Sequence, residues 1–444
     1  NSSTTGSTVT PGTITANGDP TASTDSPFDD PAGFLFGENG DEGIIKMGSY
    51  KGNGSSLDVF LGYEPQYLLL KRTDTAENWQ LLDSMRGWIH GENEKYLAPN
   101  TTAAEGSYGF GHPTATGFAL DGSWQNGDGN TYIYVAVRRP DGYVGKPAAA
   151  GTDVFTMDTG ASTDSLPNYD SGFPVDYAIY KFYQSTPSWY TASRLTGTYE
   201  WRPSSTHVQS TYDKNVWDSN VGYQSSSNDS TSIAYMWKRH QGFDVITYVG
   251  NGSSNRQLIH SMNKVPEMMW VKNRENSSDN WAVYHKDIAI VSGGTDSETD
   301  YLHLNNSESY YDGANVWQDT KPTANNFTIG SADIVNRDDD HFIAMLFTSV
   351  DGISKVGGYA GQTNDLTITT GFQPRFLLIK RINAVQNWLV VDTTRGWGSG
   401  TDQIIALNDN AAQSNSVGGG DIGAPTSTGF TLVGDKGDWC TNGS

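Results

Sequence analysis

Short apolar segments separated by polar turns recur along most of the chain. The segments are about 5–9 residues long, rich in Val, Ile, Tyr, Phe and Trp, and bounded by Gly, Asn and Asp. Such runs are typical of β-strands, and no stretch of helical length shows a clear amphipathic period. Turns recur about every 8–12 residues, which favours antiparallel β-sandwiches or small barrels. The pattern therefore predicts an all-β protein.

One combination of strands and turn occurs four times. A Pro opens an apolar run that ends in Lys, and a Trp follows after a polar turn. The Pro-to-Trp separations are 14, 15, 15 and 14 residues, a spacing that chance would not hold. A propeller blade would be about half as long as these repeats, so four blades fit less well. The four anchors read PQYLLLK with Trp79, PVDYAIYK with Trp189, PEMMWVK with Trp281 and PRFLLIK with Trp388.

These repeats set the predicted domains, because a 444-residue chain exceeds what one core organises. The second and third repeats diverge from the first and fourth in their loops. We expect a flexible Ser/Thr/Gly-rich linker followed by four tandem jelly-roll-like β-sandwiches of about 100 residues each. The expected ranges are 1–40 for the linker and 41–140, 141–240, 241–350 and 351–444 for the repeats.

The closing strand of the repeat is the element that differs most in the fourth copy. The first three repeats end in aromatic and β-branched runs that begin at Thr131, Thr231 and His341. The fourth repeat does not reach such a run. An unpaired neighbouring strand is a template for another chain. We therefore expect either that the sequence stops at Ser444 just before this strand or that another chain supplies the strand.

Charge and composition exclude several functions. Asp and Glu number 50 against 28 Lys and Arg, a formal net charge of −22, so nucleic acid and anionic lipid surfaces would be repelled. No window approaches eighteen apolar residues, which argues against membrane insertion. Cys440 is the single cysteine, so neither disulfides nor thiolate metal cages are expected. The eight histidines lack metal-binding spacing, and no cofactor is expected.

Tryptophan offers two kinds of candidate residue. A Trp that occupies the same position in every repeat is expected to pack in the repeat core, because indole burial is a large stabilising contribution. A Trp that differs between repeats and lies in a polar turn is the better candidate for stacking on a sugar, although chain-to-chain contacts use the same residues. The core candidates are Trp79, Trp189, Trp281 and Trp388, and the carbohydrate candidates are Trp124, Trp201, Trp217, Trp317 and Trp439.

Two further patterns suggest chemistry but have simpler structural interpretations. In the DxxRG elements, Asp83 with Arg86 and Asp392 with Arg395 could belong to a glycan-binding or catalytic site. Pairing across a turn, which orders the loop, is favoured. The NGDGN turn from Asn126 and the RDDDH run from Arg337 carry oxygen ligands suited to Ca²⁺. Neither has the spacing of an EF-hand loop, so solvated acidic turns are favoured. No catalytic residue is singled out.

Four stretches carry a family pattern: SPFDDPAGFLFGENGDEGIIKMGSYKGNG from Ser26, PQYLLLKRTDTAENWQLLDSMRGW from Pro65, NTTAAEGSYGFGHPTATGFAL from Asn100 and TYIYVAVRRPDG from Thr131. They resemble the repeated β-domain of tail fibre and other virion structural proteins of tailed bacteriophages, especially phages of marine bacteria and cyanophages. The resemblance implies a virion location, a homotrimer, contacts with other virion proteins and, for a tail fibre segment, attachment to a host surface glycan.

The sequence leaves three other functions open. One is a capsid decoration or head fibre protein built from the same domains. Another is a virion-associated glycan depolymerase, which would need two carboxylates about 5–10 Å apart. A bacterial surface adhesin is the third. No enzyme is expected, because nothing singles out one pair among the 50 acidic residues.

Overall fold

The computed structural model confirms the all-β prediction, with 40% strand and 5% helix. It describes residues 44–440 apart from 89–93, 115, 121, 139–144, 146, 162–166, 218, 226–229, 290–295, 416–419 and 437–438. The linker expected over 1–40 lies outside the described residues. The described part of the chain contains no helix with the length and apolar character needed to cross a membrane.

The first repeat consists of two antiparallel sheets that face each other. Leu68 and Leu70 of one sheet pack against Phe118 and Leu120 of the other, and buried and exposed residues alternate along the strands. The larger sheet has the order β1 (Ile45–Lys51), β9 (Thr131–Arg138), β3 (Pro65–Arg72) and β4 (Gln80–Asp83). We call these four the opening, closing, Pro and Trp strands. The smaller sheet contains β2 (Leu57–Phe60), β8 (Gly117–Leu120) and β7 (Gly111–Thr114), and β5 (Glu94–Tyr96) pairs with β6 (Gly106–Tyr108).

The second repeat keeps the same strand order and extends it. Its large sheet runs β10 (Phe155–Thr159), β17 (Ser232–Trp237), β12 (Tyr177–Phe182), β13 (Tyr190–Ser193), β14 (Tyr199–Trp201) and β15 (Ser210–Thr211). The small sheet pairs β11 (Tyr169–Asp170) with β16 (Gly222–Tyr223).

The third repeat repeats this layout. Its large sheet runs β18 (Phe243–Val249), β25 (His341–Phe347), β20 (Met268–Asn273), β21 (Ala282–His285), β22 (Asp300–His303) and β23 (Tyr311–Asp312). Two short helices, α2 (Ala314–Trp317) and α3 (Asp333–Asn336), accompany the pair β19 (Arg256–Ile259) and β24 (Asn326–Ile329). The opening, closing, Pro and Trp strands are therefore adjacent in the same order in all three repeats.

The structure describes fewer strands in the fourth repeat. Its sheets are β27 (Phe376–Lys380), β28 (Trp388–Asp392) and β29 (Ile405–Ala406), and β26 (Leu366–Thr369), β31 (Gly429–Leu432) and β30 (Pro425–Thr426). Its described residues include a Pro strand and a Trp strand but form no opening or closing strand. The detail of four jelly-roll-like sandwiches stays a prediction.

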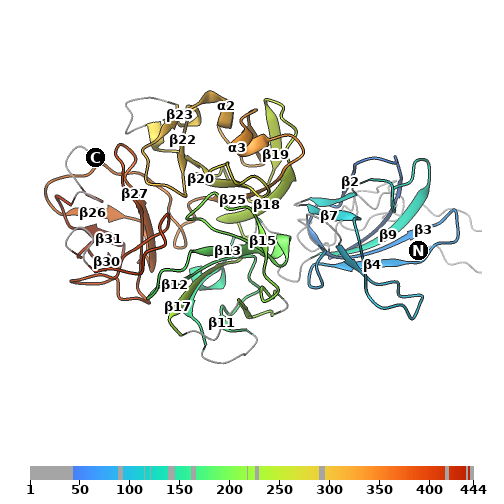
Figure 1. Cartoon of the computed structure of the whole chain (residues 1–444), viewed down its shortest axis with the longest axis horizontal. Helices are drawn as coiled ribbons and strands as arrows, with labels where there is room; N and C mark the ends of the chain where they lie inside the picture. Colours follow the sequence, from blue (N-terminus) through green and yellow to red (C-terminus); the bar gives the residue numbers. More distant parts are fainter. Residues whose placement is uncertain are drawn as a thin grey trace, which may run out of the picture.

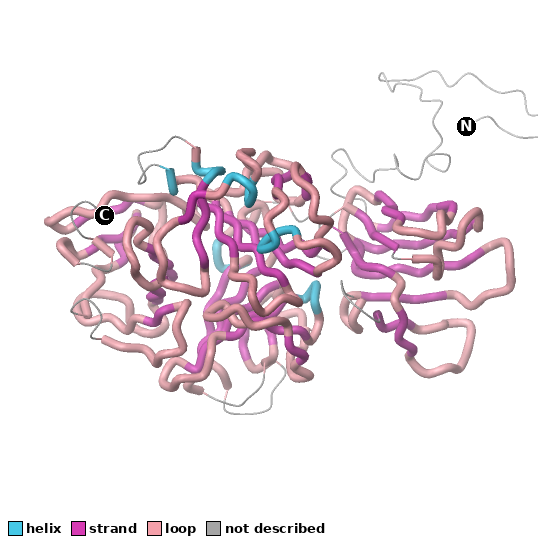
Figure 2. Tube along the Cα trace, turned by 45° about the horizontal axis from the view of Figure 1, so that its top comes forward, coloured by secondary structure: helices cyan, strands magenta, loops and turns pink. Residues whose placement is uncertain are grey.

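The second, third and fourth repeats surround a common centre, and the first repeat lies apart from them (Figure 1, Figure 2). One apolar cluster contains buried side chains from all three grouped repeats, including Trp189, Trp281 and Trp388. The first repeat has its own core. A buried ion triad joins it to the group: Arg239, near the end of the second repeat, pairs with Glu64 of the first and Asp244 of the third.

Candidate functional site

The fourth repeat leaves one edge of its Pro strand unpaired. In the other repeats this strand has a neighbour on each side: β9 and β4 flank β3, β17 and β13 flank β12, and β25 and β21 flank β20. Among the strands that the structure describes, β27 pairs with β28 alone. The position next to β27 is the one that a closing strand occupies elsewhere, so the backbone groups of this edge are open to a partner.

A second open edge faces the first. Aligning Tyr359 with Tyr50 and Tyr248 places residues 354–360 where the other repeats have their opening strand. The opening strands of the first three repeats pair only with the closing strand. Without that partner, residues 354–360 form no strand, apart from an isolated bridge at Ser354. We call the space between β27 and residues 354–360 the strand slot.

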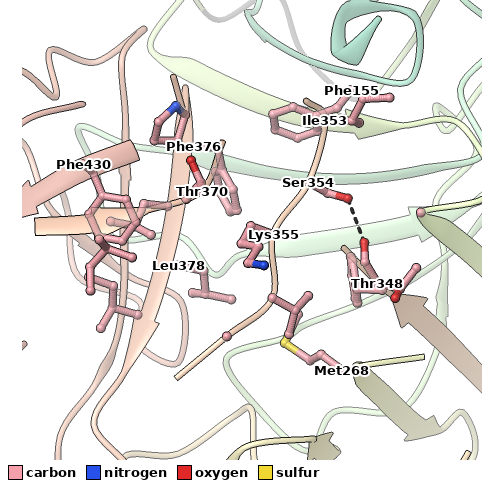
Figure 3. A pocket seen from close by; sticks show the side chains of 18 of the residues that line it. Phe155, Met268, Thr348, Ile353, Ser354, Lys355, Thr370, Phe376, Leu378 and Phe430 are labelled. Atoms are coloured by element: carbon pink, nitrogen blue, oxygen red, sulfur yellow. Dashed lines mark hydrogen bonds between the residues drawn. The ribbon is translucent and has the colours of Figure 1, made fainter. Parts of the chain in front are cut away.

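The strand slot is a real cavity with apolar walls. Its volume is about 630 Å³, and residues 374–382 and 352–359 line it continuously. Phe376 and Leu378 of β27 lie opposite Met268 and Phe155 from the neighbouring repeats, with Lys355 between them (Figure 3). Four of the five residues of β27 are only half-buried, whereas five of the six in β20 are buried. The Pro strand of the fourth repeat therefore exposes apolar surface that the equivalent strand β20 of the third repeat buries.

Equivalent strands show which side chains fit the slot. In β25, Ile343 and Met345 point into the cluster shared by the three repeats, while Ala344 and Leu346 point into the core of their own repeat. Both faces of that strand are buried, as both faces of β17 are. A strand in the slot would likewise contact two apolar surfaces, since Trp270 and Phe347 of its lining belong with the shared cluster and Phe430 and Trp439 belong to the core of the fourth repeat.

The charges around the slot do not form a hydrolytic site. Burial lowers the pKa of Lys380 to about 8 and lowers the pKa of His285. Asp287 is the one carboxylate among the residues that line the slot. Glycoside hydrolysis by the usual route needs two carboxylates. The slot is therefore suited to a peptide backbone with apolar side chains rather than to a depolymerase reaction.

The carbohydrate candidates are mostly inaccessible. The sequence places them in polar turns, but Trp201, Trp217, Trp317 and Trp439 are only 1–5% exposed, so their expected exposure is wrong. Trp217, Trp317 and Trp439 pack in the cores of their own repeats, and Trp201 packs in the cluster shared by three repeats, because an indole gains more by burial than by contact with water. Trp217, for example, packs on Tyr223 and donates its indole N–H to the Gly197 carbonyl at 2.7 Å. None of the four presents a ring face to a sugar.

Trp124 is the exception among these five residues. It is partly buried against Tyr96 and Phe110. Its neighbour Tyr108 is 49% exposed and contacts its ring edge-on. The turn of the first repeat therefore keeps one aromatic pair at the surface.

Three of the four tryptophans that recur at the same position of each repeat lie between repeats. Trp189, Trp281 and Trp388 are at most 4% exposed and sit in the shared cluster, not in the separate cores of their repeats. Their strands alternate, so the neighbouring residues face the repeat core instead, as Leu389 does. Trp79 of the first repeat is only half-buried.

Both DxxRG elements contain an ion pair within one loop. Arg86 Nε donates to Asp83 Oδ2 at 2.7 Å, and its backbone N–H donates to Asp83 Oδ1 at 2.8 Å. Arg395 and Asp392 make the same two bonds at the same distances. The second pair is almost fully buried, and Tyr235 of the second repeat donates its hydroxyl to Asp392 at 2.7 Å. The same loop geometry thus becomes a contact between repeats in the fourth copy.

The proposed calcium turns are held together by protein groups. The Asn126 carboxamide is buried, donates to the carbonyls of Ser55 and Gly122, and accepts the backbone N–H of Asn53. In the other run, Arg337 pairs with Asp279, Asp333 and Asp340. Across the described ranges, no group of three or more His, Cys, Asp or Glu side chains could hold a metal ion.

Over the described residues, the fold is an array of β-repeats in which the strand position next to β27 is open. The chain belongs to the family described as a domain of unknown function (DUF7483), whose pattern matches residues 3–139 and 196–444. The unmatched stretch between them lies in the first half of the second repeat, one of the two that diverge. A comparison with curated proteins gave no match.

Proposed function

We propose that this chain is a structural assembly protein that binds an extended β-strand in the strand slot of its fourth repeat. One observation carries the proposal: two open backbone edges flank an apolar cavity at the position where the other three repeats hold a strand. A strand added there gains main-chain hydrogen bonds on both sides, and its alternate side chains gain two apolar surfaces.

The first repeat indicates the register of the added strand. Its closing strand runs antiparallel to β3 and pairs Val137 with Tyr67 and Val135 with Leu69. Phe376 and Leu378 occupy the positions of Tyr67 and Leu69 on β27. The added strand therefore runs antiparallel to β27, with apolar residues opposite Phe376 and Leu378 and with small or apolar residues between them.

Binding of a synthetic closing strand tests this function. A labelled peptide TYIYVAVR, the sequence of Thr131–Arg138, should bind with a stoichiometry of one per chain. Binding is measured by fluorescence anisotropy, and hydrogen exchange should slow in residues 376–380 and 354–360. The matched control is the same peptide with Ala136→Pro, which removes one amide donor and should not bind.

A variant of the protein completes the test. Leu378→Arg places a charge in the slot and should abolish binding of the Thr131–Arg138 peptide. If this peptide and its proline control bind equally, or if exchange in residues 376–380 does not change on binding, strand addition is refuted.

The wider setting that we propose is the virion of a tailed bacteriophage, with the chain as a tail fibre segment that attaches to a host surface glycan. The sequence resemblance supports this setting, and so does an architecture of tandem β-repeats without disulfides. The surface pair of Trp124 and Tyr108 is the place where a sugar could stack.

A glycan and whole-cell binding screen, combined with a reducing-sugar assay, tests the attachment role. Binding that Trp124→Ala weakens, without sugar release, supports attachment. Sugar release would replace the proposal with a depolymerase. Absence of both binding and release would refute attachment and favour a capsid decoration or head fibre role.

A further inference from the structure

Three repeats of this chain bind one another in a closed cycle. The indole N–H of each recurring Trp donates to a backbone carbonyl of the next repeat: the second repeat donates to the fourth, the fourth to the third, and the third to the second. The bonds run from Trp189 to Ala406 at 2.8 Å, from Trp388 to His303 at 2.9 Å and from Trp281 to Arg202 at 3.2 Å.

Two more contacts repeat in the same cyclic order. The Lys that ends each Pro strand donates to the carbonyl four residues after the Trp acceptor. These bonds are Lys181 to Asn410 at 3.1 Å, Lys380 to Ser307 at 3.0 Å and Lys272 to Thr206 at 3.2 Å. The backbone N–H seven residues after the Trp acceptor donates in the opposite direction, from Gln413 to Tyr183 at 2.7 Å, from Tyr310 to Ile382 at 3.0 Å and from Gln209 to Arg274 at 2.7 Å.

The three contacts define a pseudo-threefold ring. In the third and fourth repeats, the residue that carries the acceptor carbonyl pairs with the residue that follows the Trp of the same repeat: His303 with Ala282, and Ala406 with Leu389. In the second repeat, Trp201 pairs with Thr191, and Arg202 follows in the same register, so the three interfaces are equivalent. The faces of the large sheets that point away from the repeat cores meet at the centre, where they form the shared apolar cluster. In this protein, such a face is covered by two further repeats.

The first repeat has the same face, and no described residue of the chain covers it. Met47 is 64% exposed, whereas the equivalent Met157 and Val245 are 5% and 0% exposed. Ile133 is 38% exposed, whereas Ile233 of the second repeat is fully buried. The face of the β1-β9-β3-β4 sheet is therefore an apolar surface of the kind that the ring buries.

The first repeat also contains the Trp and Lys that make the cyclic bonds in the ring, but there they make no bond to another repeat. Among the described residues, the indole N–H of Trp79 has no acceptor, and Lys71 donates only to the carbonyl of its neighbour Arg72. In the segment that corresponds to the acceptors of the ring, residues 101–105 are exposed, whereas Ala98 is buried.

We propose that this face of the first repeat binds the first repeats of two other copies of the chain, so that three chains form a homotrimer. The ring of the second, third and fourth repeats supplies the geometry. If the first repeats of three chains meet as the three ring repeats do, each interface between two chains contains three hydrogen bonds. Trp79 Nε1 of one chain donates to the Ala98 carbonyl of the next, and Lys71 Nζ donates to its Thr102 carbonyl. The Glu105 backbone N–H of that next chain donates back to the Thr73 carbonyl. The surface is separate from the strand slot, so the two proposals stand independently.

Measurement of the particle mass tests the stoichiometry. Light scattering during size exclusion of the full chain at micromolar concentration should give three times the 48.2 kDa mass of one chain. Met47→Lys and Ile133→Lys place charges on exposed positions of the face, so they should preserve the fold and reduce the mass to that of one chain. Ile259→Lys, on a third-repeat residue that is 59% exposed, is the matched control and should remain trimeric.

A cross-link tests the cyclic arrangement itself. Thr73→Cys combined with Glu105→Cys, in a Cys440→Ser background, should join chains through the expected backbone contact and give a band of three chains on a denaturing gel. Each single cysteine variant should give at most two chains. A single-chain mass for the wild-type protein, a mass of two chains, or a trimer that survives both Met47→Lys and Ile133→Lys would overturn the proposal.

Discussion

Replacing Arg239 with Met should weaken the connection between the first repeat and the ring. The guanidinium pairs with Glu64 of the first repeat and, through Nε at 2.6 Å, with Asp244 of the third. The side chains are 1%, 7% and 0% exposed, respectively, so solvent does not screen the triad. Without Arg239, two carboxylates remain buried near each other without their shared cation.

The expected loss is large for one substitution. Removing one partner of a buried ion pair costs about 3–5 kcal/mol, because an uncompensated charge remains in the interior. Asp244 keeps two backbone donors, Val245 N–H and Ser261 N–H, both at 2.8 Å, which limits its share of the loss. Burial without the shared cation disfavours the charged form of a carboxyl group. The destabilisation of the variant should therefore be small in acid and should grow as the pH rises through about 4.

Urea unfolding at acidic and neutral pH measures the loss of stability and its pH dependence. Hydrogen exchange of the residues around Glu64, Arg239 and Asp244 measures the loosening of the first repeat from the ring. Arg72→Met is the matched control, since Arg72 also bridges two carboxylates, Asp74 and Glu77, but at the surface. Exposed pairs contribute about 0–1 kcal/mol. The reasoning is refuted if Arg239→Met costs no more than Arg72→Met, or if its cost does not depend on pH.

Three further changes have defined outcomes. Trp281→Ala should cost about 3–5 kcal/mol in unfolding experiments because its indole is fully buried; a loss below about 1 kcal/mol would contradict its place at the centre of the ring. Burial lowers the pKa values of Lys181, Lys272 and Lys380 to about 8 from 10.5, so the folded chain binds fewer protons than the unfolded chain above pH 8. The free energy of unfolding should therefore rise between pH 8 and about 9.5, and Lys272→Met should flatten that rise; a fall over this window in the wild type would show that another group dominates. Asn336→Ala should cost about 1–3 kcal/mol, because the carboxamide donates to two carbonyls and accepts a backbone N–H in the same turn; thermal unfolding at an unchanged midpoint would contradict this role.

The sequence predicted the all-β class of the fold and the missing closing strand of the fourth repeat. Strand alternation and the constant Pro-to-Trp spacing are local signals, so the all-β class followed from them. The expected lack of a closing strand in the fourth repeat pointed toward the strand slot, although not to the apolar residues around it. The expected exposure of Trp201 and Trp317 was wrong because the polarity of neighbouring residues does not show whether a segment packs on its own repeat, as Trp317 does, or on other repeats, as Trp201 does.

The ring could not be predicted from the sequence. Its recurring acceptors are backbone carbonyls of Ala406, Arg202 and His303, three residues that share no side-chain property. The donors are visible in the sequence, because the Trp and the Lys recur in all four repeats. Their recurrence predicted packing inside each repeat and not contacts between repeats.

The ring also constrains the order in which the chain can fold. The bond from Trp189 to Ala406 spans 217 residues, so the cycle closes only after the fourth repeat has been synthesised. Until then, the second and third repeats expose the apolar sheet faces that later form the centre, and contacts of such long sequence separation form slowly. The first repeat pairs its strands within Ile45–Arg138 and can complete its own core early. Synthesis from the N-terminus therefore yields a folded first repeat attached to a ring that remains open, and prone to aggregation, until the last strands emerge.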